Sequence, residues 1–341
     1  MAKLHLITGA TGLLGSHIAK QLCEAGERVR AFIRPTSDTR HLRDLDVELY
    51  TGQLDDIASI RRAVEGTDIV YHCAACVSDW GSWNEFHTGT VVTTKNLVQA
   101  CLKAGTPRIL HVSSISVYGK RVPKDGLVPE STPIGQSHWL WDHYGRTKVL
   151  AEEQFQKYPD VVIVRPSWVY GPCDRNSIPR VIKALRSGRV RVIGPGDNTL
   201  NMVFAADVAR GAVLAAQSNK TQGKSYHLCS PGEATQRDLL DLLCNQLKLP
   251  PVKRTIPLQW AWRAAFLVEL LFRIARRRQP PPITRRAIYM IGRTTRFSIE
   301  AAERDFGWKP LMPLQDGLKT TVDWYLQQEQ QKPNNHQQSE S

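Results

Sequence analysis

The sequence has few cysteines and no pattern that pairs them. Seven cysteines are scattered over 341 residues, which is an odd number and far below the density of small secreted domains held together by disulfides. We therefore expect reduced thiols. A signal peptide is not expected either, because Leu4 to Thr8 has the pattern of a strand that runs directly into a glycine-rich turn. Both observations predict a cytoplasmic protein.

The sequence also lacks the patterns of nucleic-acid-binding proteins, although its formal net charge is +13. The excess charge is local, because residues 253–296 hold eleven basic residues and one acidic residue, Glu269. No helix-turn-helix pattern and no platform of aromatic and basic residues accompanies this segment. We therefore expect no nucleic-acid partner, and the basic segment favours an anionic membrane surface or an acidic ligand.

No hydrophobic run is long and uncharged enough to span a membrane. The most apolar stretch, residues 260–278, is interrupted by two arginines and a glutamate, whereas a spanning helix needs ~20 residues almost free of charge. On a helical wheel five of its six charged side chains fall within an arc of about 140°. They are Arg263, Glu269, Arg273, Arg276 and Arg277. The stretch predicts an amphipathic helix, which serves as a lid on the protein, as a peripheral membrane contact or as the face of a homodimer.

Short apolar strands alternate with helical segments through the first half of the sequence. Apolar residues make up 42% and charged residues 23%, as in ordinary globular proteins, which excludes disordered and fibrous classes. The near-continuous apolar strands predict an α/β fold with a doubly wound parallel sheet. The regular alternation of strands and helices ends after residue 170, so we expect a first domain over residues 1–170. A smaller C-terminal substrate lobe over residues 171–326 would include a strand near 225–229, and the polar segment 327–341 is predicted to be disordered.

A glycine-rich loop at residues 8–15 (TGATGLLG) follows the first predicted strand and opens the first predicted helix. Gly9 allows a tight turn, Gly12 lets the backbone approach a pyrophosphate, and Gly15 lets the helix pack closely. The N-terminus of the helix then holds the anion. The remaining contacts expected from this loop are Thr11, Leu13 and Leu14. The loop predicts a dinucleotide site.

The second predicted strand ends with an arginine where an acidic residue would bind the ribose hydroxyls of NAD. Its sequence is AFIRPTS over residues 31–37. A guanidinium can pair bidentately with a 2′-phosphate, which a carboxylate would repel. Arg34 therefore predicts that NADP(H) is preferred over NAD(H), with Thr36 and Ser37 as further donors. The alternative is an arginine that only meets solvent at the end of the strand.

A tyrosine and a lysine lie four residues apart in YGRTK, at residues 144–148. This spacing puts Tyr144 and Lys148 on one face of a helix, one turn apart. A phenol has an ordinary pKa near ~10 and transfers protons poorly at neutral pH, and a nearby cation favours its ionised form. About thirty residues earlier, a predicted strand ends in Ser113 and Ser114. Within a dinucleotide fold, this combination predicts a proton-transfer site.

Together these motifs resemble the extended short-chain dehydrogenase/reductase family, over nearly the whole chain to about residue 326. The motifs that follow the order and spacing of the family are the glycine loop, SSISVYG at 113–119, YGRTK at 144–148 and RPSWVYGP at 165–172. The resemblance implies a Rossmann sheet that binds NAD(P). It also implies that Ser114 polarises the substrate oxygen, that Tyr144 is the acid/base, and that Lys148 holds the nicotinamide ribose.

The same resemblance implies further cofactor contacts at the ends of several strands. They are Gln53, Leu54, Ala74, Pro166 and Val169. Two positions depart from the family pattern. Gln53 replaces an aspartate near the adenine, and its amide can still bond the adenine edge. Thr90 replaces an asparagine that helps to hold a proton-relay water in the family, so this departure concerns the relay and not the hydride step.

The serine, tyrosine and lysine of this family serve epimerases, dehydratases and reductases alike, so the pocket must decide the reaction. Dehydratases follow the catalytic hydroxyl with an acidic pair, whereas Ile115 and Ser116 follow Ser114 here. Epimerases usually carry an asparagine at the position of Trp168, and a tryptophan there favours an apolar substrate. Loops that fold over the substrate in the family also carry tryptophans, of which we expect Trp80 and Trp83 to contact it, although each ring alone is better explained as a loop anchor.

Two segments, 282–310 and DWGSW at 79–83, are most similar to the 3β-hydroxysteroid dehydrogenase branch and its bacterial 3-oxoalkanoate-reducing relatives. We therefore predict NAD(P)-dependent interconversion of a ketone and a secondary alcohol on a sterol-like or long-chain substrate. The alternatives are a nucleotide-sugar epimerase, an enzyme like the dihydroflavonol reductases, and a cofactor-binding scaffold without turnover. Cys73 and Cys76 lie in the loop beside the nicotinamide, and without a second ligand pair we expect no metal site.

Overall fold

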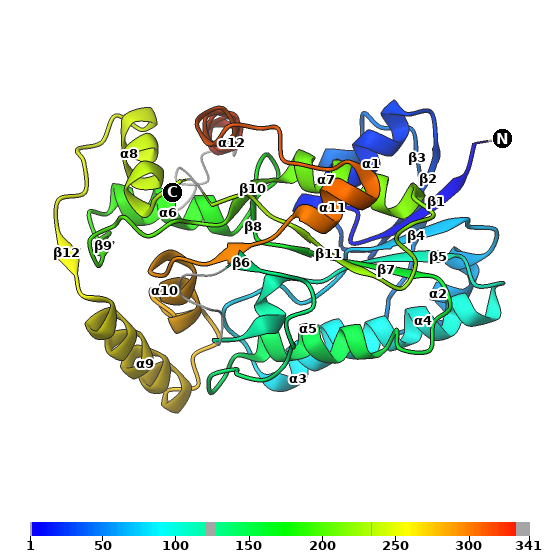
Figure 1. The fold of residues 1–341 in the computed structure, drawn as a ribbon, viewed down its shortest axis with the longest axis horizontal. Coiled ribbons are helices and arrows are strands. Elements are labelled where there is room, and N and C mark those ends of the chain that lie inside the picture. The colour runs from blue at the N-terminus through cyan, green and yellow to red at the C-terminus, as the bar shows by residue number, and fades with distance from the viewer. Residues whose placement is uncertain (1, 121–126, 233, 332–341) are drawn as a thin grey trace, which may run out of the picture.

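Seven parallel strands form the central sheet of the protein (Figure 1). The computed structural model describes residues 2–120, 127–232 and 234–331. The strand order is β11-β7-β5-β4-β1-β2-β3, which reverses its direction of progress between β1 and β4 as in doubly wound folds and confirms the predicted fold class. The strands are β1 (Leu4–Thr8), β2 (Arg28–Ile33), β3 (Val47–Thr51), β4 (Ile69–His72), β5 (Arg108–Val112), β7 (Val161–Pro166) and β11 (Ser225–Leu228).

Helices cover both faces of this sheet because successive strand residues point to opposite sides. Leu6 of β1 packs into a core with Ile60, whereas its neighbour Ile7 packs into another core with Ile18 and Val208. On one face α1 contacts α7, and on the other α2 contacts α4. The helices of this half are α1 (Leu13–Glu24), α2 (Ile57–Val64), α3 (Trp83–Phe86), α4 (Thr93–Lys103), α5 (His143–Glu153), α7 (Ala205–Gln217) and α11 (Glu300–Phe306).

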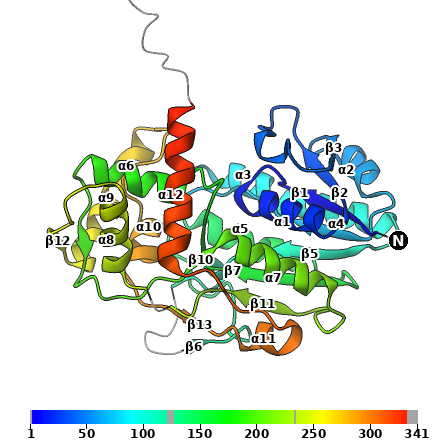
Figure 2. The same ribbon diagram turned by 90° about the horizontal axis from the view of Figure 1, so that it is seen from above.

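A second lobe lies at one end of the sheet and has its own apolar core (Figure 2). Its helices are α6 (Ser177–Arg186), α8 (Gln236–Gln246), α9 (Leu258–Ile274), α10 (Arg285–Ile291) and α12 (Leu314–Gln330). Short parallel pairs accompany them, namely β8 (Trp168–Tyr170) with β10 (Met202–Phe204), β9 (Val192–Ile193) with β12 (Thr255–Ile256), and β6 (Leu127–Val128) with β13 (Arg296–Phe297). Residues from the strand ends of the sheet and from this lobe line one common cavity.

The strand expected near residues 225–229 belongs to the large sheet and not to the smaller lobe. It is β11, which pairs in parallel with β7 in the register Tyr226 to Val164. Helix α7 leads back to this edge after the excursion of residues 171–204, and α11 packs against β11. The sequence signal misplaces the strand because that excursion interrupts the regular strand-helix spacing.

The C-terminal segment is helical further than its composition predicts. Helix α12 runs to Gln330, so its last turn includes the start of the segment expected to be disordered. The hydroxyl of Tyr325 donates to Glu329 at 2.7 Å, and Arg186 pairs with the same carboxylate at 2.8 Å, which holds this turn to α6. The rest of that prediction, residues 332–341, lies outside the described residues.

The charged side chains of helix α9 lie partly in the interior and partly in solvent. Glu269 is buried, where it accepts the Arg285 guanidinium at 2.8 Å and the Arg285 backbone N–H at 2.7 Å. The Arg273 guanidinium lies 4.5 Å from the ring centre of Trp80 and 4.6 Å from that of Trp141. The outward side is apolar, with Trp260, Leu267, Leu271 and Ile274 each more than half exposed. This helix therefore packs partly through charges and leaves apolar side chains uncovered.

Candidate active site

The glycine-rich loop joins β1 to α1 with the close contacts that its motif predicts. Gly9 has a φ of 70°, a conformation that favours glycine. A Cβ atom on Gly15 would lie 2.3 Å from the carbonyl oxygen of Gly9, so a side chain there would displace the loop. Helix α1 follows Gly12 with no side-chain cap and no acidic residue in its first turn. Its first N–H groups are thus available to an anion, which fits the pyrophosphate of a dinucleotide.

One cavity of about 1670 Å³ runs from this loop to the second lobe. Its volume exceeds the ~300 to 1,000 Å³ of a typical small-molecule site, which leaves room for a substrate beside a dinucleotide. The structure brings all of the predicted cofactor contacts together on its wall. They are Gly9, Thr11, Gly12, Leu13, Leu14, Gly15, Arg34, Gln53, Leu54, Ala74, Tyr144, Lys148, Pro166 and Val169.

Arg34 lies on the exposed rim of this cavity, after the last residue of β2. Its backbone N–H donates to Ser37 Oγ at 3.0 Å, which shapes the turn. Asp38 follows, but Arg40 and Arg175 pair with it at 2.8 and 3.3 Å and hold the pKa of its carboxyl well below the usual range. Within the described parts of the chain, Arg34 has no ion pair of its own. The rim is therefore positively charged and suits a phosphate.

Ser114, Tyr144 and Lys148 line the middle of the same cavity. Lys148 Nζ donates to the carbonyl oxygen of Val112 at 2.8 Å and lies 5.9 Å from the centre of the Tyr144 ring. Ser114 Oγ donates to Ser116 Oγ at 3.1 Å. All three residues are buried apart from their cavity-facing atoms. A hydroxyl, a phenol and an ammonium thus belong to three largely buried residues on the wall of one cavity.

Buried polar contacts hold the strand end and the helix that carry these residues. At the start of α5, Asp142 accepts the backbone N–H of Gly145 at 3.2 Å. Further along this helix, Glu152 accepts Ser113 Oγ at 2.5 Å and pairs with Arg165 of β7 at 2.7 Å. The end of β5, the helix α5 and the neighbouring strand are therefore fixed to one another, which preorganises the site.

His72, at the end of β4, is a buried residue that sequence reasoning missed. Its Nδ1 lies 2.8 Å from Thr8 Oγ1 and its Nε2 lies 3.0 Å from Thr94 Oγ1. Burial lowers the pKa of His72 to about 3, so the ring is neutral at physiological pH. Thr90, at the position of the family's asparagine, accepts the backbone N–H of Cys76 at 3.1 Å. The polar groups in this corner thus hold the strand ends to the π-helical segment His87–Val92 that precedes α4.

Cys73 is half-buried and follows His72 directly in the chain. Burial raises the pKa of its thiol to about 12, so the thiol stays protonated and is a poor metal ligand or nucleophile. In the described ranges, all seven cysteines are free and no group of three or more metal-ligating side chains gathers. The side chain of Cys73 packs against the apolar core that contains Ile7 and Ile18.

The structure separates the three tryptophans that were expected to contact a substrate. Trp168 lines the cavity. The Trp80 indole instead packs on α9 and its Nε1 donates to the carbonyl oxygen of Arg277 at 3.0 Å. Trp83 lies under the guanidinium of Arg146, 4.9 Å from its ring centre. Neither Trp80 nor Trp83 is on the cavity wall, because both rings are used to anchor their loop.

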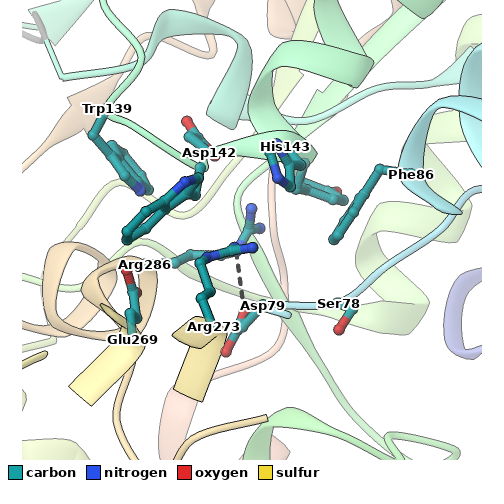
Figure 3. A pocket seen from close by; sticks show the side chains of 11 residues that line it. Ser78, Asp79, Phe86, Trp139, Asp142, His143, Glu269, Arg273 and Arg286 are labelled. Carbon is teal, nitrogen blue, oxygen red and sulfur yellow. Dashed lines mark ion pairs between the residues drawn. The ribbon is translucent and has the colours of Figure 1, made fainter. Parts of the chain in front are cut away.

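The ion pair of Arg286 with Asp79 belongs to a charge cluster that is the second feature sequence reasoning missed (Figure 3). The Arg286 guanidinium lies 3.9 Å above the centre of the Tyr144 ring and pairs with Asp79 at 3.2 Å. Arg180 pairs with the same carboxylate at 2.7 Å. Arg286 belongs to the basic segment 253–296, which was treated as one charged surface. In the structure Arg286 lies on the short helix α10, which follows the prolines at 280–282.

Known proteins were compared with this chain. The model of the NAD dependent epimerase/dehydratase family matches residues 5–229. The chain is 31% identical over 323 residues to a 2-alkyl-3-oxoalkanoate reductase of Stenotrophomonas maltophilia, covering 92% of this chain and 97% of the relative. It is 28% identical to the decarboxylating sterol-4-alpha-carboxylate 3-dehydrogenase of Mus musculus, covering 94% and 90%. The crystal structure of gox2253 superposes with a TM-score of 0.80 at 29% identity, over 97% of this chain and 100% of that one.

No helix in the described part of the chain is long and apolar enough to cross a membrane. This includes α9, whose 17 residues contain Arg263, Glu269 and Arg273.

Proposed function

Because the chain belongs to the NAD dependent epimerase/dehydratase family, we propose that it interconverts a ketone and a secondary alcohol on an apolar, sterol-like or long-chain substrate. It is an oxidoreductase of the extended short-chain dehydrogenase/reductase type and acts between CH–OH and C=O groups. The observation that carries the proposal is that Ser114, Tyr144 and Lys148 line the same cavity as the glycine loop.

Each of these residues has a role in handling the substrate oxygen. When bound, a nicotinamide dinucleotide supplies or accepts a hydride, and the side chains of this protein manage the accompanying proton. The Tyr144 hydroxyl gives a proton to the oxygen in reduction and takes it back in oxidation. The Ser114 hydroxyl holds that oxygen by a hydrogen bond, and the Lys148 ammonium stabilises negative charge beside it. The glycine loop holds the pyrophosphate.

NADP(H) is the preferred cofactor in this proposal. Arg34 on the cavity rim is not engaged by a carboxylate of the described residues, whereas Asp38 is neutralised by two arginines. A 2′-phosphate at this rim would meet a guanidinium rather than an exposed acid. The charge on the rim therefore supports NADP(H) over NAD(H).

An apolar substrate is supported by the wall of the cavity and by the named relatives. Apolar side chains of the second lobe, such as Trp168, Leu240, Ile283 and Met290, line it. The relatives are named for alkyl-oxoalkanoate and sterol substrates, which are largely hydrocarbon. Burial of hydrocarbon against such a wall contributes about 25 cal/mol for each Å² removed from water.

A turnover screen with the purified protein tests the proposal. NADPH consumption is expected with long-chain or steroid ketones, and no conversion is expected with UDP- or dTDP-sugars. Robust turnover of a nucleotide sugar with inert ketones would replace the proposal by an epimerase. Stoichiometric NADPH binding without consumption on any compound would instead indicate a scaffold.

We also propose that α9 makes a peripheral contact with an anionic lipid surface inside the cell. The helix lies at the outer edge of the lobe (Figure 1), and its outward residues Leu267 and Leu271 are 55% and 54% exposed. The run Arg276 to Arg278 follows the helix and is exposed. Ala264, on the same helix, lines the cavity, so lipid-dissolved substrate would meet the cavity beside the contact. An apolar stripe flanked by arginines suits anionic headgroups over a hydrocarbon layer.

A further inference from the structure

Three charged side chains from distant segments meet beside the acid/base tyrosine. Asp79 lies in the loop after β4, Arg180 on α6 and Arg286 on α10. Both guanidiniums pair with the single carboxylate, so this cluster carries one excess positive charge. In Figure 3 Arg286 points toward Asp79 across the small pocket that also holds Trp139 and Asp142.

Arg286 is engaged only weakly by its partner. It meets Asp79 through Nε at 3.2 Å, and none of its N–H groups makes a hydrogen bond to another part of the described chain. Its side chain is 16% exposed, so water replaces these bonds only in part. A guanidinium carries five donors in a planar fork that matches a carboxylate bidentately. A half-buried arginine with unused donors on a cavity wall is therefore a ready site for an anion.

The position of Arg286 restricts where that anion lies on the ligand. The guanidinium is 3.9 Å above the centre of the Tyr144 ring, whose hydroxyl meets the reacting oxygen in the proposed function. A carboxylate that pairs with Arg286 must then be only a few bonds from the reacting carbon. The hydrocarbon remainder of the ligand would continue along the apolar wall.

Resting on the proposed function, we propose that Arg286 binds a substrate carboxylate attached to the carbon next to the reacting carbon. The preferred substrate class is then a 3-oxo or 3-hydroxy carboxylate with a large apolar part. In the absence of substrate, Asp79 occupies one edge of Arg286. When the substrate carboxylate binds, Asp79 keeps Arg180 as its partner, so no buried charge is left alone.

The test compares a long-chain 3-oxo carboxylate with its methyl ester, both assayed with NADPH. We expect the native protein to prefer the acid in kcat/KM by roughly 10- to 100-fold, as for a charge-assisted pair. Arg286→Gln should lose that preference by lowering kcat/KM for the acid while leaving the ester within about threefold. Arg254→Gln, an exposed arginine of the same basic segment, serves as the matched control and should leave both substrates unchanged.

Two further variants keep the test decisive. Arg286→Lys retains the charge without the planar fork, so it should lose part of the preference for the acid. Asp79→Asn removes the competing carboxylate and should lower KM for the acid only. Thermal unfolding and NADPH titration of each variant confirm that fold and cofactor site are intact.

The outcomes separate this inference from the proposed function. Equal losses on acid and ester in Arg286→Gln would mean that the guanidinium acts on Tyr144, and would overturn the carboxylate site. A native protein that does not distinguish acid from ester would overturn it as well, while ketone turnover leaves the proposed function standing. If neither these compounds nor an uncharged long-chain ketone is turned over, the proposed function itself fails.

Discussion

The nucleotide-binding half and the substrate lobe build their parts of the site in different ways. In the first half, the binding groups are backbone N–H groups of one continuous segment. Gly9 and Gly15 pack against each other and leave the first N–H groups of α1 accessible to a ligand. On the substrate side, side chains from separate segments meet only after folding, as Asp79, Arg180 and Arg286 do. The residues proposed to bind the cofactor are thus close together in the sequence, whereas those proposed to recognise the substrate come from separate segments.

This difference has a physical basis. A pyrophosphate is recognised through N–H groups that every residue possesses, so only the glycines that permit close approach need to be specified. A particular substrate must be matched by charge and shape, and those depend on which loops come together. Loops carry such specificity because they can vary without disturbing the sheet beneath them.

The largest effect is expected where the two halves meet, at Tyr144. Tyr144→Phe removes the proton donor and keeps the ring under Arg286, so kcat should fall by about 10² to 10⁴. NADPH affinity should stay close to that of the native protein, because the hydroxyl is aimed at the substrate oxygen. Steady-state kinetics on a confirmed ketone and a separate NADPH titration measure the two quantities.

Lys148→Ala is the informative companion to that variant. Lys148 joins α5 to the end of β5 through the Val112 carbonyl and lines the cofactor cavity. Its loss should therefore reduce both turnover and NADPH affinity. Native turnover in Tyr144→Phe would remove this residue from the acid/base role.

The next largest effect concerns the cofactor alone. Arg34→Asp exchanges the guanidinium on the cavity rim for a carboxylate, which repels a 2′-phosphate and accepts a ribose hydroxyl. We expect the ratio of the NADPH and NADH dissociation constants to shift by roughly 10²-fold toward NADH, from the lost charge-assisted bonds. Fluorescence titration of both cofactors measures the ratio, and Arg43→Asp at an exposed site nearby is the control. Equal affinity of the native protein for the two cofactors would contradict the role of Arg34.

The same contrast explains how much could be predicted from the sequence. The parallel sheet, the close approach of Gly9 and Gly15, and the placing of Tyr144 and Lys148 one turn apart on α5 follow from local periodicity and spacing, which act within a few residues. By contrast, β11 was assigned to the wrong lobe because its partner β7 lies about sixty residues earlier, beyond a non-periodic excursion.

The substrate side was harder to predict because the same residue types can either line a pocket or stabilise the fold. Trp80 and Trp83 could line a pocket or anchor a loop, and only folding shows that arginines already occupy their faces. Glu269 looked like part of a solvated arc, yet Arg285, sixteen positions along, makes its burial tolerable. Such pairings leave no periodic signal.

The free energy of unfolding should fall in mild acid because of buried histidines in the first half, whereas the second lobe should contribute little to this loss. Burial lowers the pKa of His72 to about 3 and that of His227 to about 4, and both belong to strands of the large sheet. Residues 171–204 and 229–331 contain no histidine. Because the unfolded chain binds these protons near pH 6.5 and the folded one does not, stability is full above pH 6.5 and falls as the pH drops toward 4. The loss should be roughly 2 kcal/mol for each of the two histidines at pH 5.

Urea unfolding at pH 7 and pH 5 measures this loss. His227 donates through Nδ1 to the Ser298 carbonyl at 2.9 Å and lies 2.7 Å from the Tyr118 hydroxyl through Nε2. His227→Gln should be less stable at pH 7 but should lose less stability between the two pH values than the native protein. An unchanged pH difference in this variant would show that His227 ionises equally in both states.

The smallest effect is expected at the outer edge of the lobe, on α9. Leu271→Glu places a charge in the apolar stripe and should weaken binding to vesicles of phosphatidylcholine and phosphatidylserine by about tenfold, the equivalent of one buried leucine. Leu311→Glu, at an exposed leucine outside the stripe, is the matched control and should bind as the native protein does.

Native binding should weaken with added salt, since each arginine near the headgroups contributes roughly 1 kcal/mol. Flotation without vesicle binding at any ionic strength would leave α9 as a lid, and a dimer that dissociates in Leu271→Glu would make the stripe a subunit interface instead.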